Sequence, residues 1–477
     1  MAHPRSRIQA FLLSAVLLLA GVPAPAQLAS NAIHDFMLAH AARPQHKLEA
    51  QEAFRSVDEI LKWVSNDTGL AIKAEVKREL ATRAQMEQYS IDSMHRDGGV
   101  EELREAEVVL KKFGLLPRDF QLEPFLLKLL GEQVLAYYAP EKKTVFLLDW
   151  VEPAGLRPVL AHELTHALQD QAVDIEKWTK PPGKTGMSPD AAIQDESDMA
   201  RHGVLEGQGM ITMLDFVEEP RGLSALSAVA DVQAIIEQMG AGGDSPVYRS
   251  APVYLRETLA FPYRYGMQFE RALLSHGGRK LAFEGALQNP PANAWEIMQP
   301  GSYLRGDHVP LLAMPDAAAL AGERFERVSS GPVGALDVHS LAAQFGKASQ
   351  AEKLAAEWRG GYYEALREKP ASAAEGAALE PAALKLIYVS RWSNAAIAEQ
   401  FFSLYAQSIV HKYAGARSMG DEKPAPERHI AAWQTAEGEV TMERRGELMA
   451  VCEGMPGPLA ARLREAALRA AAPVGER

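Results

Sequence analysis

The chain has 477 residues, of which 47% are hydrophobic and 23% charged, and its formal net charge is −12. This length and composition indicate a globular protein with more than one core and exclude disordered and fibrous classes. The acidic charge makes nucleic acid and anionic lipid unfavourable partners. The sequence has neither the Walker-type phosphate loop nor the G-x-S-x-G motif of serine hydrolases.

The N-terminal residues 1–26 have the pattern of a secretory signal peptide. Arg5 and Arg7 precede an apolar run over 10–22, which is too short to cross a bilayer, and the Ala-Pro-Ala sequence of 24–26 matches a cleavage site. Removal of this leader takes the net charge to −14 and leaves no integral membrane anchor. We therefore expect a periplasmic or secreted protein, in which the single cysteine, Cys452, excludes an internal disulfide.

The next region, 27–130, has a mostly helical pattern. Apolar residues recur at intervals of three and four, which is the spacing of one helix face. They include Phe54, Val57, Ile60, Leu61 and Val64. We predict an N-terminal helical region here.

A mixed pattern follows in 131–320. Two apolar runs, 134–138 and 144–148, flank a polar turn and predict a β-hairpin. A helix is expected over 156–172, with Pro158 in its first turn, and another from Pro189, capped by Ser188, to about Phe216. Further helical stretches are predicted over 261–274 and 280–287.

The last region, 321–477, has an α+β pattern. Strands are predicted over 384–389 and 439–451, and a helix over 395–413. The fold class expected for the whole chain is therefore α+β and mainly helical.

The sequence His162-Glu163-Leu-Thr-His166 carries the clearest chemistry. On a helix, residues four apart share a face, so both imidazoles can bind one metal ion. Glu163 lies beside the ligands, where a general base can take a proton from a metal-activated water molecule. The flanking residues are apolar, so the helix is expected to be buried, and a shared zinc ion would supply partners for the buried histidines.

A catalytic zinc site needs a third protein ligand. The longer pattern with a third histidine on the same chain segment is absent, because Gln169 and Ala172 occupy its glycine and histidine positions. The following helix offers several candidates, namely Asp195, Glu196, Asp198, His202 and Glu206.

These motifs resemble the gluzincin metallopeptidases, and more closely a group of exported bacterial gluzincins. The resemblance covers about 135–303 and includes 162–171, Leu205-Glu206-Gly207, Phe261-Pro262-Tyr263 with Gly266, and Asn289-Pro290-Pro291 followed by Pro300 and Tyr303. It implies a zincin-like catalytic domain over 131–320, built on the hairpin and the active-site helix. It also implies that Glu206 is the third zinc ligand, ahead of Glu196 and then His202. One departure is Met210, which stands where thermolysin-like enzymes carry an aspartate.

Other roles are open to more than one residue. Asp170 and Asp198 are candidates to orient a ligand imidazole. Candidates for stabilising an oxyanion are Tyr263, Tyr265, Tyr303 and His308. The strand over 144–148 is expected to offer its edge to an extended substrate, as in gluzincins.

The expected function is zinc-dependent hydrolysis of peptide bonds in a peptide or protein substrate. One alternative is a zinc hydrolase of a non-peptide amide, which would need a closed pocket. The other is a catalytically silent binding or assembly module on the same fold, for which the base Glu163 would have no use.

Overall fold

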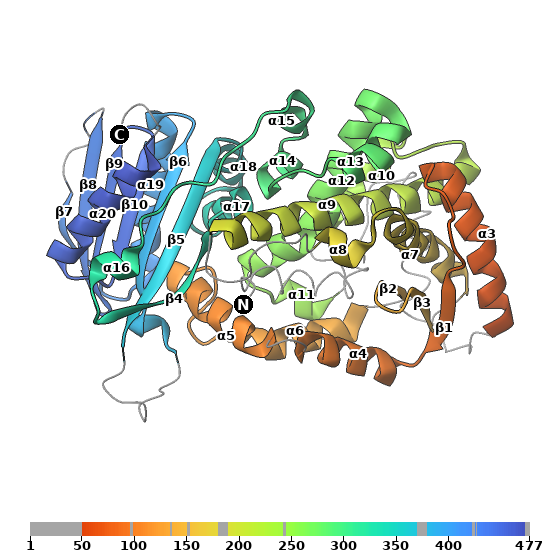
Figure 1. Cartoon of the computed structure of the whole chain (residues 1–477), viewed down its shortest axis with the longest axis horizontal. Helices are drawn as coiled ribbons and strands as arrows, with labels where there is room; N and C mark the ends of the chain where they lie inside the picture. Colours follow the sequence, from red (N-terminus) through yellow and green to blue (C-terminus); the bar gives the residue numbers. More distant parts are fainter. Residues whose placement is uncertain are drawn as a thin grey trace.

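The computed structural model describes residues 50–95, 99–133, 136–149, 153–179, 189–241, 245–369, 379–421, 425 and 427–472. The expected signal peptide lies outside them. The described chain is mixed α+β and mostly helical, which confirms the predicted class. Figure 1 shows an elongated molecule with a seven-stranded sheet at one end and a three-stranded sheet at the other. Among the described helices, none is both long and apolar enough to cross a membrane.

The N-terminal region contains a strand that the helical pattern did not predict. Its elements are α3 (Ala50–Thr68), β1 (Lys77–Ala81), α4 (Arg83–His95), α5 (Gly99–Phe113) and α6 (Leu122–Gln133). The predicted hairpin is confirmed as β2 (Ala136–Ala139) and β3 (Thr144–Leu148). β1 pairs in parallel with β3, which gives the strand order β1-β3-β2. The expectation that 144–148 is a free edge is therefore wrong, because both of its sides are occupied and β2 is the edge strand.

The same region also contacts the large sheet. In α5, the buried Lys112 pairs with Glu437 at 2.8 Å, and the ring of Phe113 packs edge-on against Tyr363 and Tyr388. The N-terminal elements thus bridge the two ends of the molecule, since β1 belongs to one sheet and α5 packs on the other.

Three long helices form the centre of the molecule: α7 (Pro153–Val173), α9 (Pro189–Glu218) and α12 (Val253–Arg279). α7 begins earlier than predicted, so Pro158 lies beyond its first turn. α9 and α12 approach closely at Gly207 and Gly266, where a Cβ on Gly207 would lie 2.4 Å from the Gly266 backbone. Only glycine permits this approach, which brings the α12 residues one turn before Gly266 next to α9.

Short elements surround these helices. They are α8 (Ile175–Thr179), the 3₁₀ turn η2 (Glu219–Arg221), α10 (Val229–Ala241), α11 (Pro246–Arg249), the π-helix η3 (Lys280–Gly285), α13 (Ala286–Gln288), α14 (Ala294–Met298), α15 (Pro300–Arg305) and α16 (Ala317–Ala321). Gly278, with φ 70° and ψ −170°, breaks the helical path before η3. The two helical stretches predicted here therefore correspond to α12 and to the η3–α13 segment.

The C-terminal region forms an antiparallel sheet of seven strands in the order β4-β5-β6-β10-β9-β8-β7. Its elements are β4 (Phe325–Pro332), α17 (Ala335–Phe345), α18 (Ala348–Ala356), β5 (Trp358–Glu368), η4 (Pro381–Ala383), β6 (Lys385–Trp392), α19 (Ala395–Lys412), β7 (Arg417–Asp421), β8 (Arg428–Thr435), β9 (Gly438–Arg445), β10 (Leu448–Glu453) and α20 (Gly457–Ala471). The single strand predicted over 439–451 is wrong: Gly446, with φ 57°, turns the chain between β9 and β10.

The two faces of this sheet carry different helices. Alternate residues of β6 point to opposite faces, so Tyr388 packs in the core that contains α19, whereas Ile387 packs with α20. Cys452 of β10 is fully buried on the α20 face as a free thiol. Both faces of the sheet are therefore covered.

A buried carboxyl group on α12 provides a test of this packing. Glu270 is fully buried against α9, and burial raises its pKa well above the usual 4.5. A pKa raised in the folded state means that stability is full below about pH 4.5 and falls as the pH rises toward the folded-state pKa. Glu270→Gln, which cannot ionise, is expected to gain stability relative to the unmodified protein between pH 5 and pH 8.

Urea unfolding at these two pH values measures the gain. The control is Glu284→Gln, because Glu284 is exposed on the neighbouring η3 segment. Equal pH dependence in the Glu270→Gln variant and the unmodified protein would contradict the prediction.

Candidate metal centre

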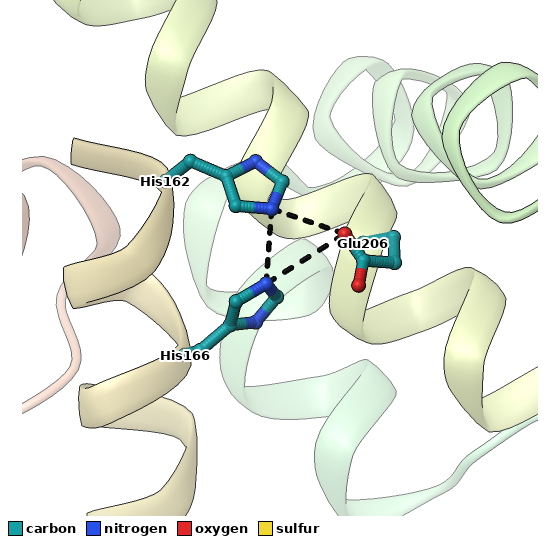
Figure 2. Close-up of side chains that lie close together, drawn as sticks. All are labelled: His162, His166 and Glu206. Carbon is teal, nitrogen blue, oxygen red and sulfur yellow. Dashed lines mark hydrogen bonds and ion pairs between the residues drawn. The ribbon is translucent and has the colours of Figure 1, made fainter. Parts of the chain in front are cut away.

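Helices α7 and α9 bring three potential metal ligands together. His162 and His166 lie one turn apart on α7, and Glu206 faces them from α9, as Figure 2 shows. His162 Nε2 lies 2.9 Å from His166 Nε2 and 3.0 Å from Glu206 Oε2, and His166 Nε2 lies 3.6 Å from the same oxygen. All three residues are buried. This cluster could hold a metal ion.

The close fit of the two helices positions His162. A Cβ on Gly209 of α9 would lie 2.7 Å from His162 Cε1, so the imidazole ring occupies the space that any larger residue at 209 would need. His162 itself is completely buried. The ring therefore has little freedom to turn away from Glu206.

The buried groups of the cluster shift one another's pKa values. Burial lowers the pKa of His162. Burial opposes ionisation of Glu206 as well, but the charge of His166 and hydrogen bonds from both histidines lower the pKa of Glu206 to about 2. Against the effect of burial, the carboxylates of Glu206 and Glu163 raise the pKa of His166 to about 9. Two imidazole nitrogens 2.9 Å apart beside a carboxylate need a proton or a metal ion between them.

Glu163 is held beside the ligands by the edge strand. Its Oε2 accepts a hydrogen bond from the Tyr138 backbone N–H at 2.8 Å. Burial raises the pKa of Glu163 to about 8. A buried carboxyl group in this position can both accept and return a proton.

The structure distinguishes the three candidates for the remaining ligand. Within the described residues, His162, His166 and Glu206 are the only group of three His, Cys, Asp or Glu side chains close enough to share a metal ion. Glu196, near the start of α9, instead accepts a hydrogen bond from the Ala294 N–H at 3.3 Å. His202 is buried on α9 but does not belong to the group.

The residue that contacts His166 Nδ1 was not predicted from the sequence. Gln169 Oε1 lies 2.8 Å from this nitrogen. Asp170 instead accepts hydrogen bonds from the Tyr138 hydroxyl, the Lys143 ammonium and the Ile175 N–H. The signal for Gln169 was its position three residues after His166, which places both on one face of α7. Asp198, the other candidate, lies two turns before Glu206, where its charge acts on Arg201.

Of the four candidates for oxyanion stabilisation, Tyr263 adjoins the cluster. It lies on α12 one turn before Gly266, near enough to the cluster for the charges of Glu206 and Glu163 to act on its hydroxyl. Burial and the carboxylates of Glu206 and Glu163 raise the pKa of Tyr263, so its hydroxyl stays neutral and can donate.

The other three have partners elsewhere. Tyr265 donates to Glu352 at 3.0 Å, and Tyr303 donates to the Asn289 carbonyl at 2.6 Å. His308 is mostly exposed and lies 3.0 Å from Glu296.

Comparisons of the chain with protein-family models, with curated proteins and with solved structures found no match. The chemistry of the cluster therefore carries the functional argument by itself. Three potential ligands lie on two helices, with the carboxyl group of Glu163 and the neutral hydroxyl of Tyr263 near them, and such a cluster could hold a metal ion.

Proposed function

We propose that this protein is a zinc-dependent peptidase of the gluzincin type. The observation that carries the proposal is the convergence of His162, His166 and Glu206, with Glu163 adjacent to the two histidines on α7. Two histidines and one carboxylate form a ligand set found in catalytic zinc sites that keep one coordination position open. The leader-like pattern of residues 1–26 supports an exported compartment for this activity.

The donor distances fit zinc. A tetrahedral zinc ion with ligand bonds of about 2.0–2.2 Å separates its ligand atoms by about 3.3 Å. The three separations in the cluster run from 2.9 to 3.6 Å. Imidazole nitrogen suits zinc, whereas magnesium and calcium prefer sites made entirely of oxygen.

The protein groups around the ligands divide the work of hydrolysis. A zinc ion held by His162, His166 and Glu206 would lower the pKa of a water molecule and polarise the substrate carbonyl. Glu163 takes a proton from the water molecule as the water oxygen adds to the carbonyl carbon. Glu163 then returns that proton to the leaving nitrogen as the C–N bond breaks. Because Tyr138 occupies Oε2, we assign this proton transfer to Oε1 of Glu163.

The position of β2 supports a peptide substrate, because among the described residues β2 is the outer strand of its sheet and lies beside Glu163. Tyr138 directs its backbone N–H to Glu163, so the side of β2 that faces away from β3 adjoins the general base. An extended chain can add to such an edge through backbone hydrogen bonds, which accept varied side chains. In this proposal β2 has the role that the sequence predicted for 144–148.

Metal analysis combined with a peptide-library digest tests the proposal. Protein purified from zinc-containing medium is expected to carry about one zinc per chain, as one three-ligand site requires, and to cleave peptides. Folded protein that takes up no zinc would overturn the proposal. Zinc-loaded protein that cleaves only non-peptide amides would favour the alternative hydrolase.

Tyr263 is proposed to donate a hydrogen bond to the developing oxyanion. Tyr263→Phe removes only the hydroxyl, and we expect kcat to fall by about 10²–10³-fold with zinc still bound. The matched control is Tyr265→Phe, because Tyr265 donates to Glu352 instead. Equal kcat values for the two variants would remove Tyr263 from the mechanism.

A further inference from the structure

Two glutamines connect His166 to the protein backbone. Gln169 on α7 and Gln208 on α9 are both completely buried. Gln169 Nε2 donates to the Leu205 carbonyl at 3.1 Å and to Gln208 Oε1 at 2.8 Å. Gln208 Nε2 in turn donates to the Ala282 and Phe283 carbonyls of η3, at 2.8 and 3.2 Å. The chain of hydrogen bonds therefore runs from His166 across α9 to η3.

The backbone carbonyls determine which way each amide points. A carbonyl oxygen only accepts hydrogen bonds, so the atom of Gln208 that faces Ala282 and Phe283 must be its nitrogen. Its oxygen then faces Gln169. The same reasoning orients Gln169, since its nitrogen must face the Leu205 carbonyl and its oxygen must face His166.

This orientation has a consequence for His166. The Gln169 oxygen lies 2.8 Å from His166 Nδ1 and cannot donate, so Nδ1 must carry a proton. In a neutral imidazole the other nitrogen, Nε2, then has its lone pair free. Nε2 is the atom that faces His162 and Glu206.

We propose that Gln169 and Gln208 form an amide relay that fixes the Nδ1–H tautomer of His166 and so holds its Nε2 ready for the metal. This inference rests on the proposed zinc site. In this assignment Gln169 and Gln208 are positioning residues, since they act through His166.

An amide in this position differs from the carboxylate that often holds a metal-binding histidine. A carboxylate at 169 would add a third negative charge to a buried site that already contains Glu163 and Glu206. The amide fixes the tautomer without that charge.

The relay predicts graded losses of zinc affinity, which competition with a chromophoric chelator measures on the full-length protein. Gln169→Met has nearly the same shape but cannot accept from Nδ1, and is expected to bind zinc about 10–100-fold more weakly. Gln208→Met is expected to lose less zinc affinity than Gln169→Met, because the Leu205 carbonyl still orients Gln169. The double variant is expected to bind no more weakly than Gln169→Met alone, because Gln208 acts only through Gln169.

The chain offers a matched control. Gln171 lies two residues further along α7, and its oxygen accepts from the Lys73 and Ala74 N–H groups, away from the cluster. Gln171→Met is expected to leave zinc affinity unchanged. Equal zinc affinities for Gln169→Met and Gln171→Met would overturn the relay.

A conservative variant separates the relay from simple packing. Gln169→Glu keeps an oxygen acceptor for His166 and is expected to bind zinc more tightly than Gln169→Met. If Gln169 only fills space, Gln169→Met is expected to bind zinc more tightly than Gln169→Glu, because burying methionine costs less free energy than burying a carboxylate. Thermal unfolding of each metal-free variant establishes that it is folded.

Nitrogen-15 NMR of the zinc-loaded protein reads the tautomer directly. The relay predicts a proton on Nδ1 of His166 that exchanges slowly with water in the unmodified protein and rapidly in Gln169→Met. An Nδ1 without a proton would overturn the relay. Zinc affinity and NMR do not depend on turnover. If the variants show the expected order of zinc affinities but the protein cleaves no peptide, the relay is supported and the peptidase is rejected. If the protein cleaves peptides but Gln169→Met and Gln171→Met bind zinc equally well, the peptidase is supported and the relay is rejected.

Discussion

Glu163→Gln is expected to retain zinc and to lose peptide hydrolysis. The side chain keeps its shape, and the proposed zinc ligands His162, His166 and Glu206 are unchanged. The amide cannot take a proton from water, so the contribution of a general base is lost, which is about 10²–10⁴-fold in kcat. Steady-state kinetics on a peptide identified by the library digest, together with metal analysis of the same sample, measure both quantities.

The matched control for this substitution is Glu176→Gln. Glu176 is exposed on α8, and its replacement is expected to change neither kcat nor zinc content. If Glu163→Gln hydrolyses peptides at the unmodified rate, Glu163 is not the base. If the unmodified protein binds zinc but cleaves nothing, the cluster belongs to a binding or assembly module.

The histidine pair was predictable because its geometry is local. Any helix places residues 162 and 166 on one face, and α7 does form over them. Glu206 is different, because it lies 44 positions after His162 and reaches it only through the packing of α9 on α7. No helical periodicity indicates which of several carboxylates on α9 will face α7, so the choice of Glu206 depended on the resemblance to gluzincins.

The partner of His166 was missed for a chemical reason. Carboxylates are the usual partners of metal-binding histidines, which directed attention to Asp170. Asp170 is one residue further round the helix and is engaged by Tyr138 and Lys143 instead. Gln169 has the right position, and its role becomes visible only when the backbone carbonyls of α9 and η3 orient the two amides.

The errors in the fold also come from long-range contacts. The sequence of β1, Lys-Arg-Glu-Leu-Ala, has no β-branched or aromatic residue, and only its pairing with β3 makes it a strand. Because β1 was not predicted, β3 was taken for an edge strand. The boundary between β9 and β10 depends on one glycine, Gly446, within an otherwise continuous strand pattern.

Glu206→Ala is expected to weaken zinc binding by orders of magnitude and to abolish hydrolysis at ordinary zinc concentrations. The substitution removes one of the three proposed protein ligands and would leave two imidazoles and water around the ion. The loss is expected to exceed the roughly 10–100-fold effect of removing a residue that only supports a ligand, such as Gln169. Competition with a chelator measures the dissociation constant, and thermal unfolding with and without zinc shows whether the ion still stabilises the fold.

Glu196→Ala is the matched control, since Glu196 belongs to the same helix but contacts the Ala294 N–H. Its zinc affinity is expected to stay within a few-fold of the unmodified protein. Equal losses of zinc affinity in the two variants would mean that both substitutions perturb α9 rather than remove a ligand. The unfolding temperatures of the two metal-free variants would then be lowered by similar amounts. A loss confined to Glu196→Ala would move the third ligand to the start of α9. A loss confined to Glu206→Ala identifies the third ligand, because the two substitutions remove the same side chain from one helix and differ only in what that side chain faces.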